Sequence, residues 1–118
     1  MSAISRVGTV VVPVSDQERA LEFWRGLGFE VRIDGPFGDG GRWIEVAPPG
    51  AATTLALVPG PAAMEVSLAT ANAGVDHADL LAQGVDADEE LLDMGPGVPP
   101  MFTFRDPDGN RFRMVERD

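Results

Sequence analysis

The chain holds few side chains that could carry nucleophilic or metal chemistry. It contains no cysteine and no tyrosine, and its single histidine is His77. Thiolate nucleophiles, cysteine-ligated metals and any site that needs two histidines from one chain are therefore excluded. A Ser-His-Asp arrangement would have to use His77, which lies in a predicted helix between Asp76 and Asp79. That setting favours an ordinary solvated helix residue over a catalytic base.

Composition and charge exclude further classes of protein. Of the 118 residues, 44% are hydrophobic, which is typical of a globular domain. No apolar run approaches the roughly 18 residues that a membrane span needs, and residues 1–6 lack the pattern of a signal peptide. We therefore expect a cytoplasmic protein with no membrane partner. The net charge of −10 argues against nucleic acid as a partner, because phosphates need a basic surface.

The first half of the sequence predicts one strand, one helix and three further strands. Residues 6–14 are rich in valine and predict the first strand. Ser15 and Glu18 form a predicted capping box for the helix, and Gly28 is suited to end it in a left-handed conformation. The further strands are predicted over 29–33, 42–47 and 53–58, with a glycine-rich loop at 35–41.

The second half repeats this order of elements. A strand is predicted over 64–70, a helix from the cap Asn72 to about Gln83, and strands near 85–87, 101–105 and 110–116. The pattern predicts an α+β fold in which each half is a βαβββ module.

The spacing of the helix boundaries supports an internal duplication. The caps Asp16 and Asn72 lie 56 residues apart, and so do the helix-ending Gly28 and Gly84. We therefore predict one domain, residues 1–118, built from tandem modules at about 1–60 and 61–118. Pairing two such modules would cover the outer sheet faces with helices and leave an inner concave face for a ligand.

Three phrases of the sequence resemble one known superfamily. They are Val14-Ser15-Asp16 leading into Ala20-Leu21-Glu22-Phe23-Trp24, then Leu27-Gly28-Phe29-Glu30-Val31, and finally Phe104-Arg105-Asp106-Pro107-Asp108-Gly109-Asn110. The last is the most specific, because a DPDGN turn before the final strand is a hallmark of the vicinal-oxygen-chelate superfamily of glyoxalases, bleomycin-resistance proteins and extradiol dioxygenases. The chain resembles this superfamily over nearly its whole length. The resemblance implies two tandem βαβββ modules that form a U-shaped mixed sheet around a central cavity, with the helices outside.

The resemblance also identifies four positions that hold a metal in the metal-using relatives. In this sequence they fall on Thr9, near Ala56, on Glu65 and on Arg113. Only Glu65 could bind a cation, and Arg113 would repel one. Because a divalent ion needs three or more converging donors, we predict no metal and no other cofactor in the chain.

Strand alternation extends these positions to a lining for the cavity. If Thr9, Glu65 and Arg113 point inward, residues two positions away do so too, and the apolar residues between them pack beneath the helices. Phe37 joins the set because the glycine-rich loop would either close over a ligand or form a flexible hairpin. The predicted ligand-binding residues are Thr9, Phe37, Trp43, Glu45, Glu65, Ser67, Met101, Thr103, Arg111 and Arg113.

Charged groups on a half-buried face must be paired, so we predict an ion pair of Arg113 with Glu65 or Glu45. Two interpretations stay open. In one, the pair fills an ancestral metal site and nothing binds there. In the other, Arg113 or Arg111 anchors an anionic ligand while Trp43 supplies a stacking surface.

Three functions remain open on this basis. The first is a metal-free protein that binds a small organic molecule, similar to the drug-sequestering bleomycin-resistance proteins, although inward arginines would repel a cationic drug. The second is a lyase, isomerase or dioxygenase of the superfamily, for which a metal-free version would use Glu45 or Glu65 as a base. The third is an assembly unit, and the resemblance implies a homodimer. We favour binding over catalysis.

Overall fold

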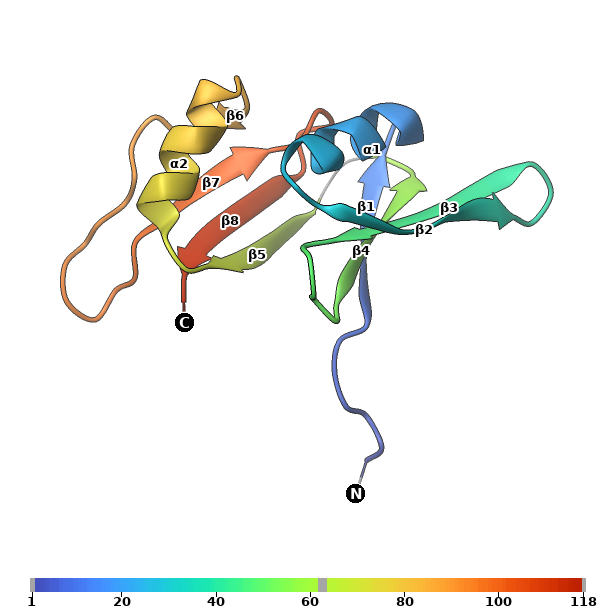
Figure 1. Ribbon diagram of the computed structural model, residues 1–118, viewed down its shortest axis with the longest axis horizontal. Helices are drawn as coiled ribbons and strands as arrows, with labels where there is room; N and C mark the ends of the chain where they lie inside the picture. The colour runs from blue at the N-terminus through green and yellow to red at the C-terminus, as the bar shows by residue number, and fades with distance from the viewer. Residues whose placement is uncertain (1, 62–63, 118) are drawn as a thin grey trace. The chain divides into compact units, whose positions relative to one another are not determined.

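The computed structural model describes residues 2–61 and 64–117 (Figure 1). These residues form two helices and eight strands, and the strands make two four-stranded mixed sheets. The chain divides into two compact units, Met1–Ala62 and Ala63–Asp118, each with the element order βαβββ. The predicted α+β class and the duplicated order of elements are therefore confirmed. Neither helix exceeds ten residues, so no helix in the described part of the chain could cross a bilayer.

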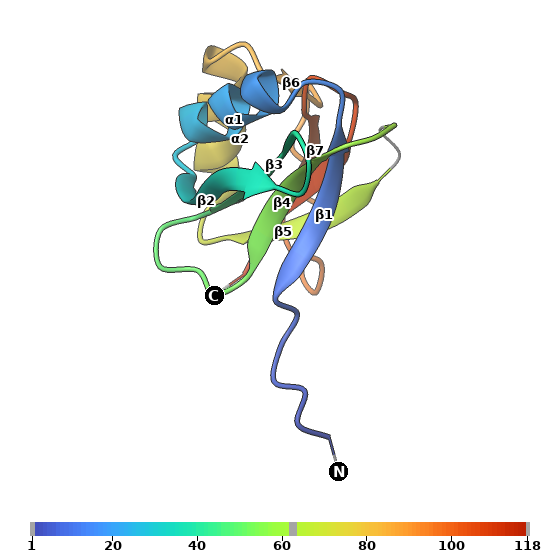
Figure 2. The same ribbon diagram turned by 90° about the vertical axis from the view of Figure 1, so that its right-hand side faces the viewer.

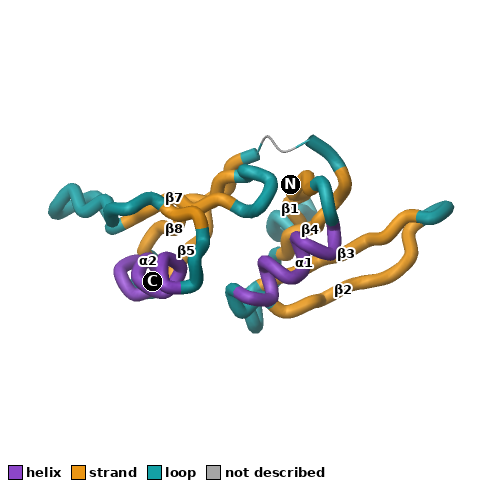
Figure 3. The backbone as a smooth tube through the Cα atoms, turned by 90° about the horizontal axis from the view of Figure 1, so that it is seen from above, coloured by secondary structure: helices purple, strands orange, loops and turns teal. Residues whose placement is uncertain are grey.

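The first module consists of one helix packed on one sheet. Its elements are β1 (Thr9–Val14), α1 (Gln17–Gly26), β2 (Glu30–Phe37), β3 (Gly41–Ala47) and β4 (Thr54–Pro59). The strand order is β1-β4-β3-β2, with β1 and β4 parallel and the other pairs antiparallel. Seen from above, α1 lies along one side of this sheet (Figure 3). Trp24 from the helix is 0% exposed, as are Val12, Ile44 and Leu57 from the strands, and these apolar side chains form the core.

The second module repeats this arrangement with an aromatic core. Its elements are β5 (Glu65–Thr70), α2 (Ala73–Ala82), β6 (Asp86–Ala87), β7 (Met101–Arg105) and β8 (Arg111–Glu116). The strand order is β5-β8-β7-β6, with β5 and β8 parallel. Phe104 and Phe112 are stacked at 5.4 Å between ring centroids, and Phe102 lies 6.4 Å from Phe104. All three are at most 1% exposed.

Burial alternates along β1 and at the start of β8 as the sequence predicted, whereas β4 and β7 have runs of consecutive buried residues. On β1, Val12 and Val14 are 0% exposed while Val11 is 52% exposed. On β8, Phe112 is buried while its neighbours Arg111 and Arg113 keep half-exposed side chains. Each sheet thus has one face under its own helix and one face that this helix does not cover.

The main differences from the predicted boundaries are in β1, α1 and β2. β1 begins at Thr9 rather than at residue 6, because its pairing with β4 begins at Thr9 and Thr54. The predicted capping box with Ser15 as the cap is wrong, whereas the cap Asp16 that the 56-residue spacing named is confirmed. The side chain of Asp16 accepts a hydrogen bond of 3.1 Å from the amide of Arg19. The extended residues before β1 are visible in Figure 2.

β2 is longer than predicted and takes in part of the glycine-rich loop. It continues through Gly35 and Pro36 to Phe37, so only residues 38–40 form the turn. Because β2 is the edge strand of its sheet, Pro36 costs no ladder hydrogen bond inside the sheet. Gly38 and Gly40 have φ of +64° and +75°, which only glycine adopts readily.

His77 is half-buried rather than the fully solvated helix residue that was predicted. Its Nε2 lies 2.7 Å from the carbonyl oxygen of Asp88, and its ring centroid lies 5.0 Å from that of Phe102. The helix face that carries His77 is turned toward the segment after β6, so the ring packs there and is only partly exposed. His77 therefore connects α2 to that segment and plays no part in the exposed sheet face.

Candidate ligand-binding site

The exposed face of the first sheet is centred on the carboxylate of Glu45. The hydroxyl of Thr54 donates a hydrogen bond of 2.6 Å to Oε1, and the indole Nε1 of Trp43 donates one of 2.7 Å to Oε2. The hydroxyl of Thr9 lies 3.5 Å from Oε1. The bonds from Thr54 and Trp43 lower the pKa of Glu45 from its usual value, against the desolvation that raises it.

The strand order brings this cluster together. β4 lies between β1 and β3, so Thr54 is paired with Thr9 on one side and Ala56 is paired with Glu45 on the other. Sequence reasoning named Thr9, Trp43 and Glu45 but missed Thr54. The signal was present, because Thr54 lies two positions before Ala56 and therefore on the same face.

An aromatic pair lies beside this cluster. Phe37 is 63% exposed, and its ring centroid lies 5.3 Å from that of Trp43. Phe37 was predicted in a loop that closes or flexes, but it is the last residue of β2 and pairs with Gly41. A Cβ on Gly41 would come within 2.2 Å of the carbonyl oxygen of Phe37, so the hairpin end requires glycine there.

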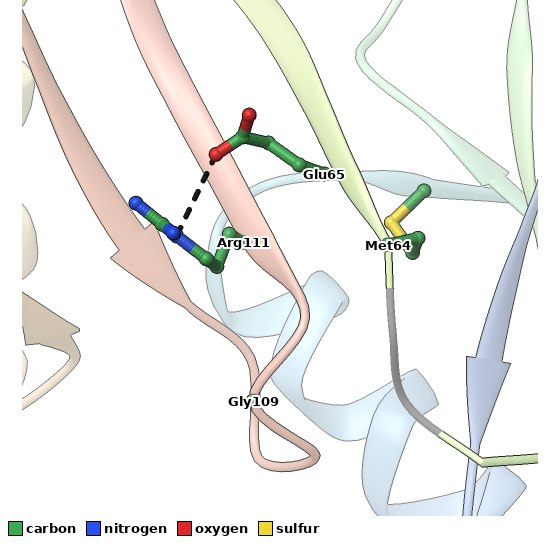
Figure 4. A pocket seen from close by; sticks show the side chains of 4 residues that line it. All are labelled: Met64, Glu65, Gly109 and Arg111. Atoms are coloured by element: carbon green, nitrogen blue, oxygen red, sulfur yellow. Dashed lines mark ion pairs between the residues drawn. The ribbon is translucent and has the colours of Figure 1, made fainter.

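The exposed face of the second sheet is centred on Glu65 and two arginines. Glu65 Oε1 lies 3.5 Å from Nε of Arg111 and 4.0 Å from Nη2 of Arg113. The predicted ion pair between Arg113 and Glu65 is confirmed, although Arg111 lies closer. Figure 4 shows Glu65 and Arg111 beside a pocket of about 280 Å³, which Met64 and Gly109 also line. Sequence reasoning named neither Met64 nor Gly109.

Three further predicted residues lie on the strands beside this cluster. Ser67 and Thr103 are the partners of Arg113 on β5 and β7, so they flank it on either side. Ser67 is exposed and Thr103 is 5% exposed. Met101 is half-buried opposite Val115, which is 5% exposed.

The DPDGN turn fixes where β8 begins and therefore where its arginines lie. The buried carboxylate of Asp106 accepts hydrogen bonds from the amides of Asp108 (3.0 Å) and Asn110 (2.8 Å) and from the side-chain Nδ2 of Asn110 (2.9 Å). Burial raises the pKa of Asp106 from its usual value, and the bonds from Asn110 act against that rise. Gly109, with φ of +83°, completes the turn.

The four positions that the resemblance assigned to a metal do not fit one. Ala56 is 0% exposed and has no donor, and Arg113 is a cation. Glu65 is engaged with two guanidinium groups, which leaves the hydroxyl of Thr9 as the remaining oxygen. Across the residues that the structure describes, no three His, Asp or Glu side chains are grouped to hold an ion. This side-chain set therefore lacks the converging donors of a divalent site.

Known proteins are similar to the chain in both sequence and fold. Residues 6–114 match the profile of the glyoxalase/bleomycin resistance protein/dioxygenase superfamily. YetH, an uncharacterized protein of Bacillus subtilis (strain 168), is 34% identical over 96% of this chain and 99% of its own.

Two solved structures are similar over nearly their whole length. TnmS3, an antibiotic binding protein from Streptomyces sp. CB03234, is 36% identical with a TM-score of 0.86, and the match covers 100% of both chains. A superfamily member from Sphaerobacter thermophilus DSM 20745 is 33% identical with a TM-score of 0.88, covering 97% of this chain and 98% of its own. The chain therefore belongs to the glyoxalase/bleomycin resistance protein/dioxygenase superfamily.

Proposed function

We propose that the protein binds a small organic molecule without a metal ion and sequesters it. The observation that carries this proposal is the exchange of side chains at the four positions above. A hydroxyl, a methyl group and a Glu–Arg pair stand where metal-dependent chemistry needs converging donors. The same sheet faces present the accessible Trp43–Phe37 pair and exposed hydrogen-bonding groups, which suit reversible binding.

The comparisons support a drug as the kind of molecule bound. TnmS3 is described as an antibiotic binding protein and matches this chain from end to end. An antibiotic is therefore the first class of ligand to test. We also propose, from the resemblance, that the protein is a homodimer, which light scattering at micromolar concentration would test.

Catalysis with a carboxylate base has less support. A general base works best when its pKa lies near the working pH. The hydrogen bonds from Thr54 and Trp43 move the pKa of Glu45 in the opposite direction, so this carboxylate is a weak base at neutral pH.

The experiment is a thermal-shift screen of antibiotics, followed by titration calorimetry of each hit. A ligand at 100 times its Kd stabilises the native state by about 2.7 kcal/mol, which raises the Tm by roughly 10 °C in a domain of this size. Quenching of tryptophan fluorescence gives a second readout, because Trp24 is 0% exposed and the accessible indole is that of Trp43. W43F is the control for that signal.

Two results would refute the proposal. One is the absence of any Tm shift across the antibiotic panel. The other is a metal bound at one ion per chain in the purified protein, together with loss of ligand binding when the metal is removed by a chelator.

A further inference from the structure

Arg111 and Arg113 are held more loosely than Arg42 and Arg105. Arg42 lies 2.8 Å from Asp34 and 2.7 Å from Glu18, and Arg105 lies 2.6 Å from Asp88. These are the short distances of charge-assisted hydrogen bonds.

Arg111 and Arg113 instead share the single carboxylate of Glu65 at 3.5 and 4.0 Å. Among the described residues, Glu65 is the one acidic group within ion-pair distance of either. The three groups together carry one excess positive charge in a chain whose net charge is −10.

The placement of the two guanidinium groups suits a shared ligand. They lie two residues apart on β8 and so project from the same face of the sheet. Their side chains are 55% and 44% exposed, so both reach solvent. The pocket beside Arg111 gives a ligand a recess to enter (Figure 4). The exposed hydroxyl of Ser67 lies on the strand beside Arg113 and adds a neutral donor.

We propose that Arg111 and Arg113 bind an oxyanion group of the ligand, a carboxylate or a phosphate, with Glu65 as the counter-ion that the ligand displaces. This inference rests on the proposed function and names the chemical group that the site recognises. A guanidinium group offers several N–H donors in a planar fork that matches an oxyanion. Arg113 stands at a position that the resemblance assigns to a metal ligand, so this position favours an anion where the metal-using relatives bind a cation.

Three naphthalene probes of similar size separate the possibilities. They are 2-naphthoate, 2-naphthyl phosphate and the uncharged 2-naphthamide, each titrated by calorimetry into the full chain. We expect wild type to bind at least one anionic probe about tenfold more tightly than the amide, which is the contribution of a charge-assisted hydrogen bond. Which of the two anions binds more tightly distinguishes a carboxylate ligand from a phosphate ligand.

Variants with opposite expected effects test the role of each group. R113Q and R111Q should each weaken the binding of the anionic probe about tenfold and leave the affinity for the amide unchanged. E65Q should increase the affinity for the anionic probe about threefold, because it removes the charge of the carboxylate that competes with the probe for the two arginines.

Each variant has a control with the same change in charge on the exposed surface of α1. R19Q matches the arginine variants and E22Q matches E65Q, and neither should alter the binding of any probe. Circular dichroism checks that each variant is folded, and the wild-type preference for an anion needs no variant at all.

The outcomes separate this inference from the proposed function. Equal affinity of wild type for all three probes, or an unchanged anion preference in the R111Q/R113Q double variant, overturns the inference while antibiotic binding stands. If E65Q lowers the Tm and no anionic probe binds, the pair is a structural plug and the inference is wrong. If neither probes nor antibiotics bind, the proposed function fails together with it.

Discussion

Replacing Ile44 with alanine should destabilise the protein by about 3–4 kcal/mol. Its side chain is 0% exposed on β3, beneath α1. Removing its three outer carbons costs about 2.4 kcal/mol at about 0.8 kcal/mol for each buried CH₂ group. The cavity left behind raises the total into the range stated. Urea unfolding followed by tryptophan fluorescence measures the change, because Trp24 and Trp43 both lie in the first module.

Ile33 on the neighbouring strand is the matched control for this substitution. It is the same residue type but is 46% exposed, so I33A should cost about 1 kcal/mol or less. The slope of the free energy against urea should be the same in both variants. An I33A variant that loses as much stability as I44A would refute the assignment of the two faces of the first sheet, and with it the exposed face that carries Trp43 and Glu45.

Three further predictions test individual contacts. Because the pKa of Glu45 is lowered in the folded state, its contribution to stability is present above its unfolded value near 4.5 and is lost as the pH falls through the folded value. The stability difference between wild type and E45Q, from urea unfolding, should therefore shrink on acidification, and a constant difference would contradict the assignment. D106A should lower the free energy of unfolding by about 2–4 kcal/mol, because the backbone amide and the side-chain Nδ2 of Asn110 lose a buried acceptor. Unfolding followed by circular dichroism measures the change, and a loss below about 1 kcal/mol would contradict this. In G41A the new Cβ would lie 2.2 Å from the carbonyl oxygen of Phe37, so the hairpin end must shift. We expect this shift to separate the rings of Phe37 and Trp43 and to change the ring-proton chemical shifts of Phe37. Unchanged shifts would show that the hairpin accepts a side chain there.

Much of the candidate site could be predicted because side chains alternate along a strand. The side chains of Trp43 and Glu45 share a face with each other, as do those of Arg111 and Arg113, whatever the strands pair with. The sequence could not show that Thr54 completes the Glu45 cluster, because that contact depends on the pairing of β3 with β4. The U-shaped sheet, the cavity between modules and the homodimer stay predictions.

The sequence by itself determined the order of elements, the caps at Asp16 and Asn72 and the buried side of β1 and β3. These properties depend on residues close together in the chain, so they can be inferred from backbone preferences and residue spacing without knowledge of any tertiary contact. Tertiary structure decided which strands are neighbours. It placed β8 between β5 and β7, so that Glu65 lies opposite Arg111 and within 4.0 Å of Arg113. Strand register is set by burial across the whole module and by partners distant in sequence, so the division of one carboxylate between two arginines appears only in the folded chain.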